Sequence, residues 1–156
     1  MKNSAPIPCR REEPRSRAIS RSLICLLVIA CGLALRGCGL GLGLPTSIVK
    51  YGGSVLWGTM VFFLVAMAAG RTPRTGIASI AGLIAIGVEL FRLVHTPELD
   101  AFRLTTAGAL LLGRVFSPWN MVAYGFGIAA GALLDRCAAS VFASAGPVRD
   151  SSSARA

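Results

Sequence analysis

The stretch YGGSVLWGTMVFFLVAMAAG, residues 51–70, decides the fold class of this chain. It is 20 residues long and contains no charged side chain. An α-helix rises about 1.5 Å per residue, so about 20 apolar residues cross the roughly 30 Å hydrocarbon core of a bilayer. The stretch therefore predicts a transmembrane helix.

Three further apolar segments surround it, over about residues 22–44, 76–94 and 119–138. Their strictly apolar parts are shorter or are interrupted by a charge, so we expect them to cross the bilayer as members of one bundle. The alternation of apolar and polar residues that is typical of strands does not occur in the sequence. The sequence predicts an all-α integral membrane bundle of about four transmembrane helices.

The composition supports the same class. Hydrophobic residues make up 54% of the chain and charged residues only 15%, and most charges lie in the first 21 residues, in short loops and near the C-terminus. A charge in hydrocarbon is costly, so this segregation is typical of a membrane protein. The net charge of +9 does not indicate nucleic-acid binding, because the basic residues flank apolar segments instead of alternating with aromatic residues on a polar face. We expect the lipid bilayer as a partner and no nucleic acid.

The chain divides into a membrane domain and two tails. Residues 1–21 are rich in Pro, Ser and Arg and predict a disordered basic tail, residues 22–142 form the transmembrane domain, and residues 143–156 form a second disordered tail. The segment LTTAGALLLGRVF, residues 104–116, has too few uncharged positions to span. We therefore expect a short interfacial or re-entrant helix over about residues 98–114, between the third and fourth spans.

The distribution of basic residues predicts the orientation, because cytoplasmic segments are enriched in Lys and Arg. With a cytoplasmic N-terminus, eleven basic residues fall inside and five outside. We therefore expect a multi-pass protein of the inner (plasma) membrane with both termini in the cytoplasm. The five outer basic residues are Arg36, Lys50, Arg92, Arg103 and Arg114.

The cysteines have irregular spacing and predict neither a disulfide framework nor a metal or cofactor site. They are Cys9, Cys25, Cys31, Cys38 and Cys137. The sequence LVIAC, residues 27–31, loosely matches a lipoprotein cleavage site, which would place a lipid on Cys31. We favour a plain first helix, because the apolar stretch before Cys31 is short for a signal peptide.

A polar passage, VELFRLVHTPELDAFR at residues 88–103, ends the third span. Glu89 lies about five residues before the end of that span, roughly 7 Å below the outer boundary at the helical rise per residue. Arg92 follows at i+3 on the same face, where an ion pair is natural. Pro97 then disfavours helix at the preceding residue, so the chain leaves the membrane there.

Further polar residues follow in the same part of the predicted topology. Asp100 and Arg103 repeat the i, i+3 spacing, and Asn120 lies at the start of the fourth span. We expect six side chains to gather at the outer interface as a substrate-binding site: Glu89, Arg92, His95, Asp100, Arg103 and Asn120. Purely structural pairing of the same charges is an equally good interpretation. His95 has no second His or Cys at metal-ligand spacing, which favours an exposed interface residue over a ligand.

The fourth span carries a G-x-x-x-G pattern at Gly127 and Gly131. Small residues at this spacing allow another helix to approach closely. The pattern does not distinguish a contact within the chain from a dimer contact, so it leaves the oligomeric state open.

The segment after the third span also carries a family pattern. A Glu ends a membrane helix, and H-x-P-x-L-D-x-x-R at 95–103, F-S-x-W at 116–119 and A-Y-x-x-G at 123–127 follow. This arrangement resembles the bacterial membrane family known as domain of unknown function 2809, which is in turn similar to the VanZ-like proteins. The resemblance covers roughly residues 34–136. The family positions fall on Glu89, His95, Pro97, Leu99, Asp100, Arg103, Gly108, Gly113, Phe116, Trp119 and Tyr124.

Two positions depart from the family pattern. Arg92 stands where the family usually has Gln, and Asn120 stands where it usually has an acidic residue. Both changes make the predicted pocket more cationic, which favours an anionic headgroup or phosphate; the alternative interpretation is that the ancestral function has drifted.

The leading functional hypothesis is a non-catalytic protein of the bacterial cell envelope. Its outer polar site would bind an anionic lipid headgroup or a lipid-linked precursor through Arg92 and Arg103, with Glu89 and Asp100 orienting the two arginines. One alternative is a membrane enzyme acting on a lipid or isoprenoid phosphate, with Glu89 or His95 as general base. A second alternative is a small transporter component.

Overall fold

The computed structural model describes residues 13–70, 72–105, 107–108 and 117–144, and its secondary structure is entirely helical. Four helices are long and apolar enough to cross a membrane, which confirms the predicted number of spans. A short helix lies between the third and fourth of them, as expected. In chain order the helices are α1 (Glu13–Cys38), α2 (Thr46–Ala68), α3 (Arg74–Phe91), α4 (Pro97–Leu104) and α6 (Pro118–Ser144).

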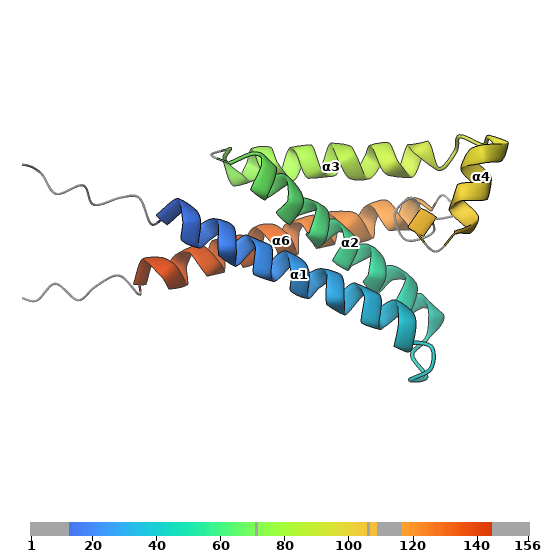
Figure 1. The fold of residues 1–156 in the computed structure, drawn as a ribbon, viewed down its shortest axis with the longest axis horizontal. Helices are drawn as coiled ribbons and strands as arrows, with labels where there is room; N and C mark the ends of the chain where they lie inside the picture. The colour runs from blue at the N-terminus through green and yellow to red at the C-terminus, as the bar shows by residue number, and fades with distance from the viewer. Residues whose placement is uncertain (1–12, 71, 106, 109–116, 145–156) are drawn as a thin grey trace, which may run out of the picture.

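The four long helices run along the long axis of the molecule, and α4 lies across the end of α3 (Figure 1). Helix α2 lies at the centre of the bundle and packs against α1, α3 and α6, while α3 also packs against α6. The start of α1 and the end of α6 lie at the same end of the bundle (Figure 1). We call this the α1-start end, and we call the opposite end, which carries α4, the α4 end.

Aromatic and small side chains form the core between α2 and its neighbours. Phe62 and Phe63 of α2 are completely buried and meet edge to face, with their ring centroids 5.6 Å apart. Helix α3 contributes Ile77 and Ala81, which are also completely buried. All four side chains belong to one buried core cluster.

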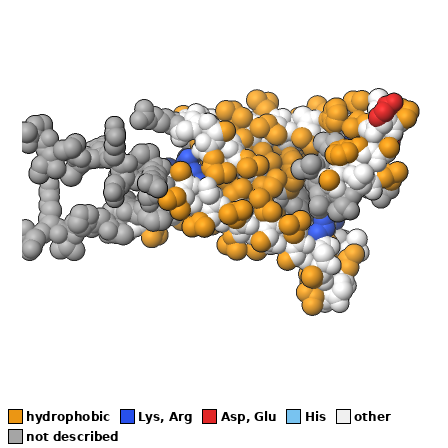
Figure 2. All heavy atoms as spheres, in the orientation of Figure 1, with side chains coloured by type: hydrophobic (Ala, Val, Ile, Leu, Met, Phe, Trp, Pro, Cys, Tyr) orange, Lys and Arg blue, Asp and Glu red, His pale blue; other side chains and the backbone are white. Residues whose placement is uncertain are grey.

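Large apolar side chains cover much of the outer surface. Leu23, Leu64, Leu83 and Leu133, from four different helices, are all exposed. Figure 2 shows hydrophobic side chains over the middle of the molecule and Lys or Arg side chains towards both ends. Extensive exposed apolar surface is unfavourable in water, whereas a bilayer solvates it.

Glycines allow α2 and α6 to approach closely. A Cβ atom added to Gly127 would collide with the backbone oxygen of Val55, and one added to Gly131 would lie 2.9 Å from the Phe62 ring. Thr59 Oγ1 donates to the Gly127 carbonyl oxygen across this contact at 2.8 Å. Gly127 and Gly131 therefore pack against α2 of the same chain.

The first helix begins earlier and ends earlier than expected. Residues 13–21 belong to α1 and not to a disordered tail, and one reason is that Arg21 is anchored by Asp135 and by the Ala66 carbonyl. The Gly/Leu run after Cys38 forms turns, not the end of a span. Gly43 adopts a φ of 77° there, a conformation that glycine permits.

The last two helices also differ from their expected bounds. Helix α6 continues to Ser144, beyond the expected end at 138. Helix α4 begins at Pro97 and ends at Leu104, because Thr105 has an extended backbone. The expected continuous helix over 98–114 is therefore interrupted at Thr105. Positions 109–116, like residues 1–12 and 145–156 of the expected tails, lie outside the described residues.

Candidate functional site

Glu89 lies at the centre of a buried polar network near the α4 end. Its side chain is 0% exposed, and its Oε2 atom is 2.6 Å from Arg92 Nη1. The Tyr124 hydroxyl donates to the same Oε2 atom at 3.2 Å and accepts from Arg92 Nη2 at 2.9 Å. The three side chains therefore close a ring: the ion pair lies within the end of α3, and the two hydrogen bonds to Tyr124 join this end to α6.

The second carboxylate oxygen of Glu89 contacts the start of α6. The Ser117 backbone N–H donates to Oε1 at 2.7 Å, and Asn120 Nδ2 lies 3.5 Å from the same atom. Ser54 of α2 donates to Asn120 Oδ1 at 3.3 Å. A carboxylate is stabilised at a helix N-terminus by the unpaired N–H groups and the helix dipole. We call Glu89, Arg92, Ser117, Asn120 and Tyr124 the Glu89 cluster.

Arg103, on the short helix α4, caps the C-terminal end of α3. Its side chain is only 4% exposed, and Nη1 and Nη2 donate to the carbonyl oxygens of Val94 and Phe91, each at 2.8 Å. The Phe91 carbonyl also accepts from the Val94 backbone N–H at 3.1 Å. The last carbonyls of a helix lack i+4 partners, and a basic side chain can satisfy them. Arg103 Nε is buried and has no hydrogen-bond partner among the described residues.

Asp100 and His95 extend this arrangement to the surface. Asp100 Oδ1 lies 3.1 Å from Arg103 Nη1 and 3.2 Å from His95 Nδ1. The His95 and Asp100 side chains are 65% and 47% exposed. We call His95, Asp100 and Arg103 the Arg103 cluster.

The structure brings the six predicted site residues together as two adjacent groups. Glu89, Arg92 and Asn120 belong to the Glu89 cluster, and the other three form the Arg103 cluster. The groups are joined through the backbone, since Arg103 binds the carbonyl of Phe91 next to Arg92. Arg92 and Asn120, the two departures from the family pattern, both contact Glu89.

Two partners of Glu89 were missing from the predicted site. The Ser117 contact uses a backbone N–H, which no side-chain pattern reveals. Tyr124 lies one helical turn after Asn120, so the i, i+4 spacing on α6 was a usable signal. Its position in the family pattern was a second signal.

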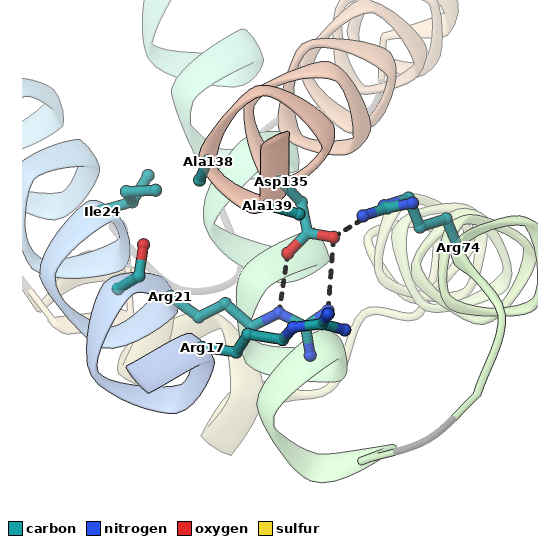
Figure 3. A pocket seen from close by; sticks show the side chains of 8 residues that line it. Arg17, Arg21, Ile24, Arg74, Asp135, Ala138 and Ala139 are labelled. Atoms are coloured by element: carbon teal, nitrogen blue, oxygen red, sulfur yellow. Dashed lines mark hydrogen bonds and ion pairs between the residues drawn. The ribbon is translucent and has the colours of Figure 1, made fainter. Parts of the chain in front are cut away.

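A third ionic network, absent from the sequence-based prediction, lies at the α1-start end. Asp135 of α6 is 5% exposed and accepts from Arg21 Nε at 2.7 Å and from Arg74 Nε at 2.9 Å. Arg21 Nη2 also reaches this carboxylate at 3.2 Å, and Arg21 Nη1 donates to the Ala66 carbonyl at 2.8 Å. Figure 3 shows these arginines converging on Asp135 from α1 and α3. We call Arg21, Arg74 and Asp135 the Asp135 clamp.

Within the described ranges, no group of three His, Cys, Asp or Glu side chains could hold a metal ion. The four described cysteines are free thiols, and Cys31 lies on the exposed surface of α1. Lipidation of Cys31 stays the alternative to the favoured plain first helix.

The chain matches the family described as "Protein of unknown function (DUF2809)" over residues 43–128, more than half of its length, and it belongs to this family. The match contains both clusters at the α4 end, whereas Arg21 and Asp135 lie outside it. The more distant similarity to VanZ-like proteins stays a prediction. No solved structure matches the chain.

Proposed function

We propose that this member of the DUF2809 family is a non-catalytic protein of the bacterial cell envelope that binds an anionic headgroup at its α4 end. The ligand would be the phosphate of an anionic lipid or of a lipid-linked precursor. The observation that supports this function most directly is the buried Nε of Arg103, which has no acceptor among the described residues. A buried N–H without an acceptor costs about 1–3 kcal/mol, so an anionic oxygen at this point would be stabilising.

The chemistry of Arg103 suits a phosphate. A guanidinium group presents several N–H donors in one plane, which matches two oxygens of a phosphate. Asp100, the acidic partner of Arg103, is about half exposed. A phosphate could therefore replace Asp100 at Arg103 while the bonds to the end of α3 remain.

Arg92 has a different role in this proposal from the one expected from the sequence. It is 9% exposed and is held by Glu89 and Tyr124. In the proposal, Arg92 positions the end of α3 and adds positive charge near the site, whereas Arg103 would contact the ligand. Glu89 would orient Arg92, and Asp100 would orient Arg103 in the unliganded protein.

In the proposed orientation, the chain lies in the inner membrane and both termini are in the cytoplasm. The support is the excess of basic residues in the segments that would face inside. The α4 end would then face outwards, where lipid-linked precursors of the envelope are used.

The test is lipid retention by the purified full chain in mild detergent. Arg103→Lys keeps the charge but loses the planar fork, so a co-purifying anionic lipid should fall about tenfold relative to the unchanged protein. Arg36→Gln, at the exposed end of α1, is the matched control and should retain the lipid. A folded Arg103→Lys protein with unchanged lipid content and unchanged envelope-antibiotic sensitivity in cells would contradict the proposal.

A second candidate function is an enzyme acting on a lipid or isoprenoid phosphate. The observation that favours it is the exposed His95–Asp100 pair. A carboxylate at Nδ1 fixes the tautomer in which the other ring nitrogen can accept a proton. Phosphate release from such a substrate by the purified chain, abolished by His95→Gln, would support this candidate over the first.

A further inference from the structure

A pocket at the α1-start end is lined by residues of three helices (Figure 3). The residues of the Asp135 clamp are part of its lining, and it lies at the opposite end of the bundle from the Arg103 cluster (Figure 1). Asp135 follows Asn120 by 15 residues on α6, which corresponds to roughly 22 Å of helix. The lining residues are Arg17, Ser20, Arg21, Ile24, Arg74, Asp135, Ala138 and Ala139.

The pocket contains more positive charge than its acidic residue neutralises. Three arginines line it, and Asp135 is the one carboxylate among the lining residues. The formal charge of the lining is therefore +2. Asp135 already accepts two bonds from Arg21 and one from Arg74.

The arginines differ in how much of their hydrogen-bonding capacity the clamp uses. Arg21 directs Nε, Nη1 and Nη2 to protein acceptors, so it is fixed in place. Arg74 uses only Nε, its side chain is 44% exposed, and neither Nη atom has an acceptor among the described residues. Arg17 lies at the exposed surface of the same pocket.

The lining also has an apolar side. Ile24 of α1 and Ala138 and Ala139 of α6 line the same pocket as the arginines. The pocket thus pairs guanidinium donors with apolar surface at the ends of membrane-spanning helices. Lipid phosphates lie at that depth, and basic pockets between transmembrane helices bind anionic headgroups.

We infer that this pocket binds a phosphate group, with Arg74 and Arg17 as the contacting residues. Arg21 is a positioning residue, because its bonds to Asp135 and Ala66 hold α1 against α6 and α2. Arg74 can offer both Nη groups to phosphate oxygens while its Nε remains on Asp135. A lipid headgroup and a soluble phosphate share this chemistry, and the apolar side of the pocket favours the lipid.

The test uses the full chain in nanodiscs of phosphatidylcholine with increasing phosphatidylglycerol, and counts retained lipids by native mass spectrometry. Arg74→Gln and Arg17→Gln should each weaken retention of one phosphatidylglycerol by about fivefold. The matched control is Arg136→Gln, which removes the same charge from an exposed neighbouring position on α6 that does not line the pocket. It should leave retention unchanged.

Inorganic phosphate distinguishes the two sources of the ligand. If millimolar phosphate raises the melting temperature of the unchanged protein in phosphatidylcholine alone, and not that of Arg74→Gln, the pocket binds phosphate from solution. If phosphate has no effect while phosphatidylglycerol is retained, the ligand is a lipid. Equal lipid retention by Arg74→Gln, Arg17→Gln and Arg136→Gln, without a phosphate effect, would overturn the inference. Arg17→Gln leaves the Asp135 clamp intact, so it remains informative if Arg74→Gln fails to fold.

Discussion

At the residue scale, the partners of Glu89 explain why its carboxylate can lie inside an apolar span. The sequence predicted its partner Arg92, because the i, i+3 spacing is local. It did not predict that the carboxylate also accepts from the start of α6, since that contact joins residues 28 positions apart through a backbone N–H. Local spacing reveals pairs within one helix, whereas partners on other helices depend on packing.

The Glu89–Arg92 pair gives a prediction for stability. Glu89→Gln removes the carboxylate charge that faces the buried guanidinium of Arg92 and should lower the free energy of unfolding by about 3–5 kcal/mol. Arg92→Gln should cost a similar amount, while the double substitution should cost clearly less than the sum of the two. Unfolding of the purified protein in detergent measures all three. Additive costs would show that the two side chains are not energetically coupled.

At the element scale, the positions of the helices were largely predictable and their ends were not. Apolar length indicates how many helices can span, so the predicted number of four candidate spans is confirmed. Polar residues 13–21 were assigned to a tail because their sequence gives no sign of the Asp135 clamp, in which Arg21 pairs with a residue 114 positions away. The end of α4 at Thr105 was not predicted either. The sequence pattern continues past this residue, and only the extended backbone of Thr105 in the structure marks the end of the helix.

The contact of α2 with α6 gives a prediction at this scale. Gly127→Ala places a methyl group against the Val55 backbone, which cannot move as a flexible side chain can. We expect a loss of about 1–3 kcal/mol in the free energy of unfolding. Gly125→Ala is the matched control, because its Cβ would meet no atom within 4 Å. It should be neutral or stabilising by up to about 1 kcal/mol, since alanine favours helix. Equal effects of both substitutions in detergent unfolding would exclude close packing at Gly127.

At the scale of the whole molecule, ionic networks lie at the two ends of an apolar bundle. The Glu89 cluster joins α3 to α6 at one end, and the Asp135 clamp joins α1, α3 and α6 at the other. Between them, α2 carries no charged residue from Tyr51 to Ala68. A path for ions or polar solutes is usually lined by polar groups through the membrane. The arrangement therefore favours binding sites at the two membrane faces over transport.

The orientation of the bundle decides which compartment each site meets, and it gives the last prediction. In a cysteine-free background, Leu42→Cys marks the turn between α1 and α2 at the α4 end, and Thr75→Cys marks the start of α3 at the α1-start end. Both positions are exposed. Because basic residues are concentrated at the α1-start end, a membrane-impermeant thiol reagent should label only Leu42→Cys in intact cells and both variants after permeabilisation. Labelling of Thr75→Cys alone in intact cells would show that the bundle has the opposite orientation in the membrane. The Arg103 cluster would then face the cytoplasm, and its proposed ligand would have to come from the inner leaflet.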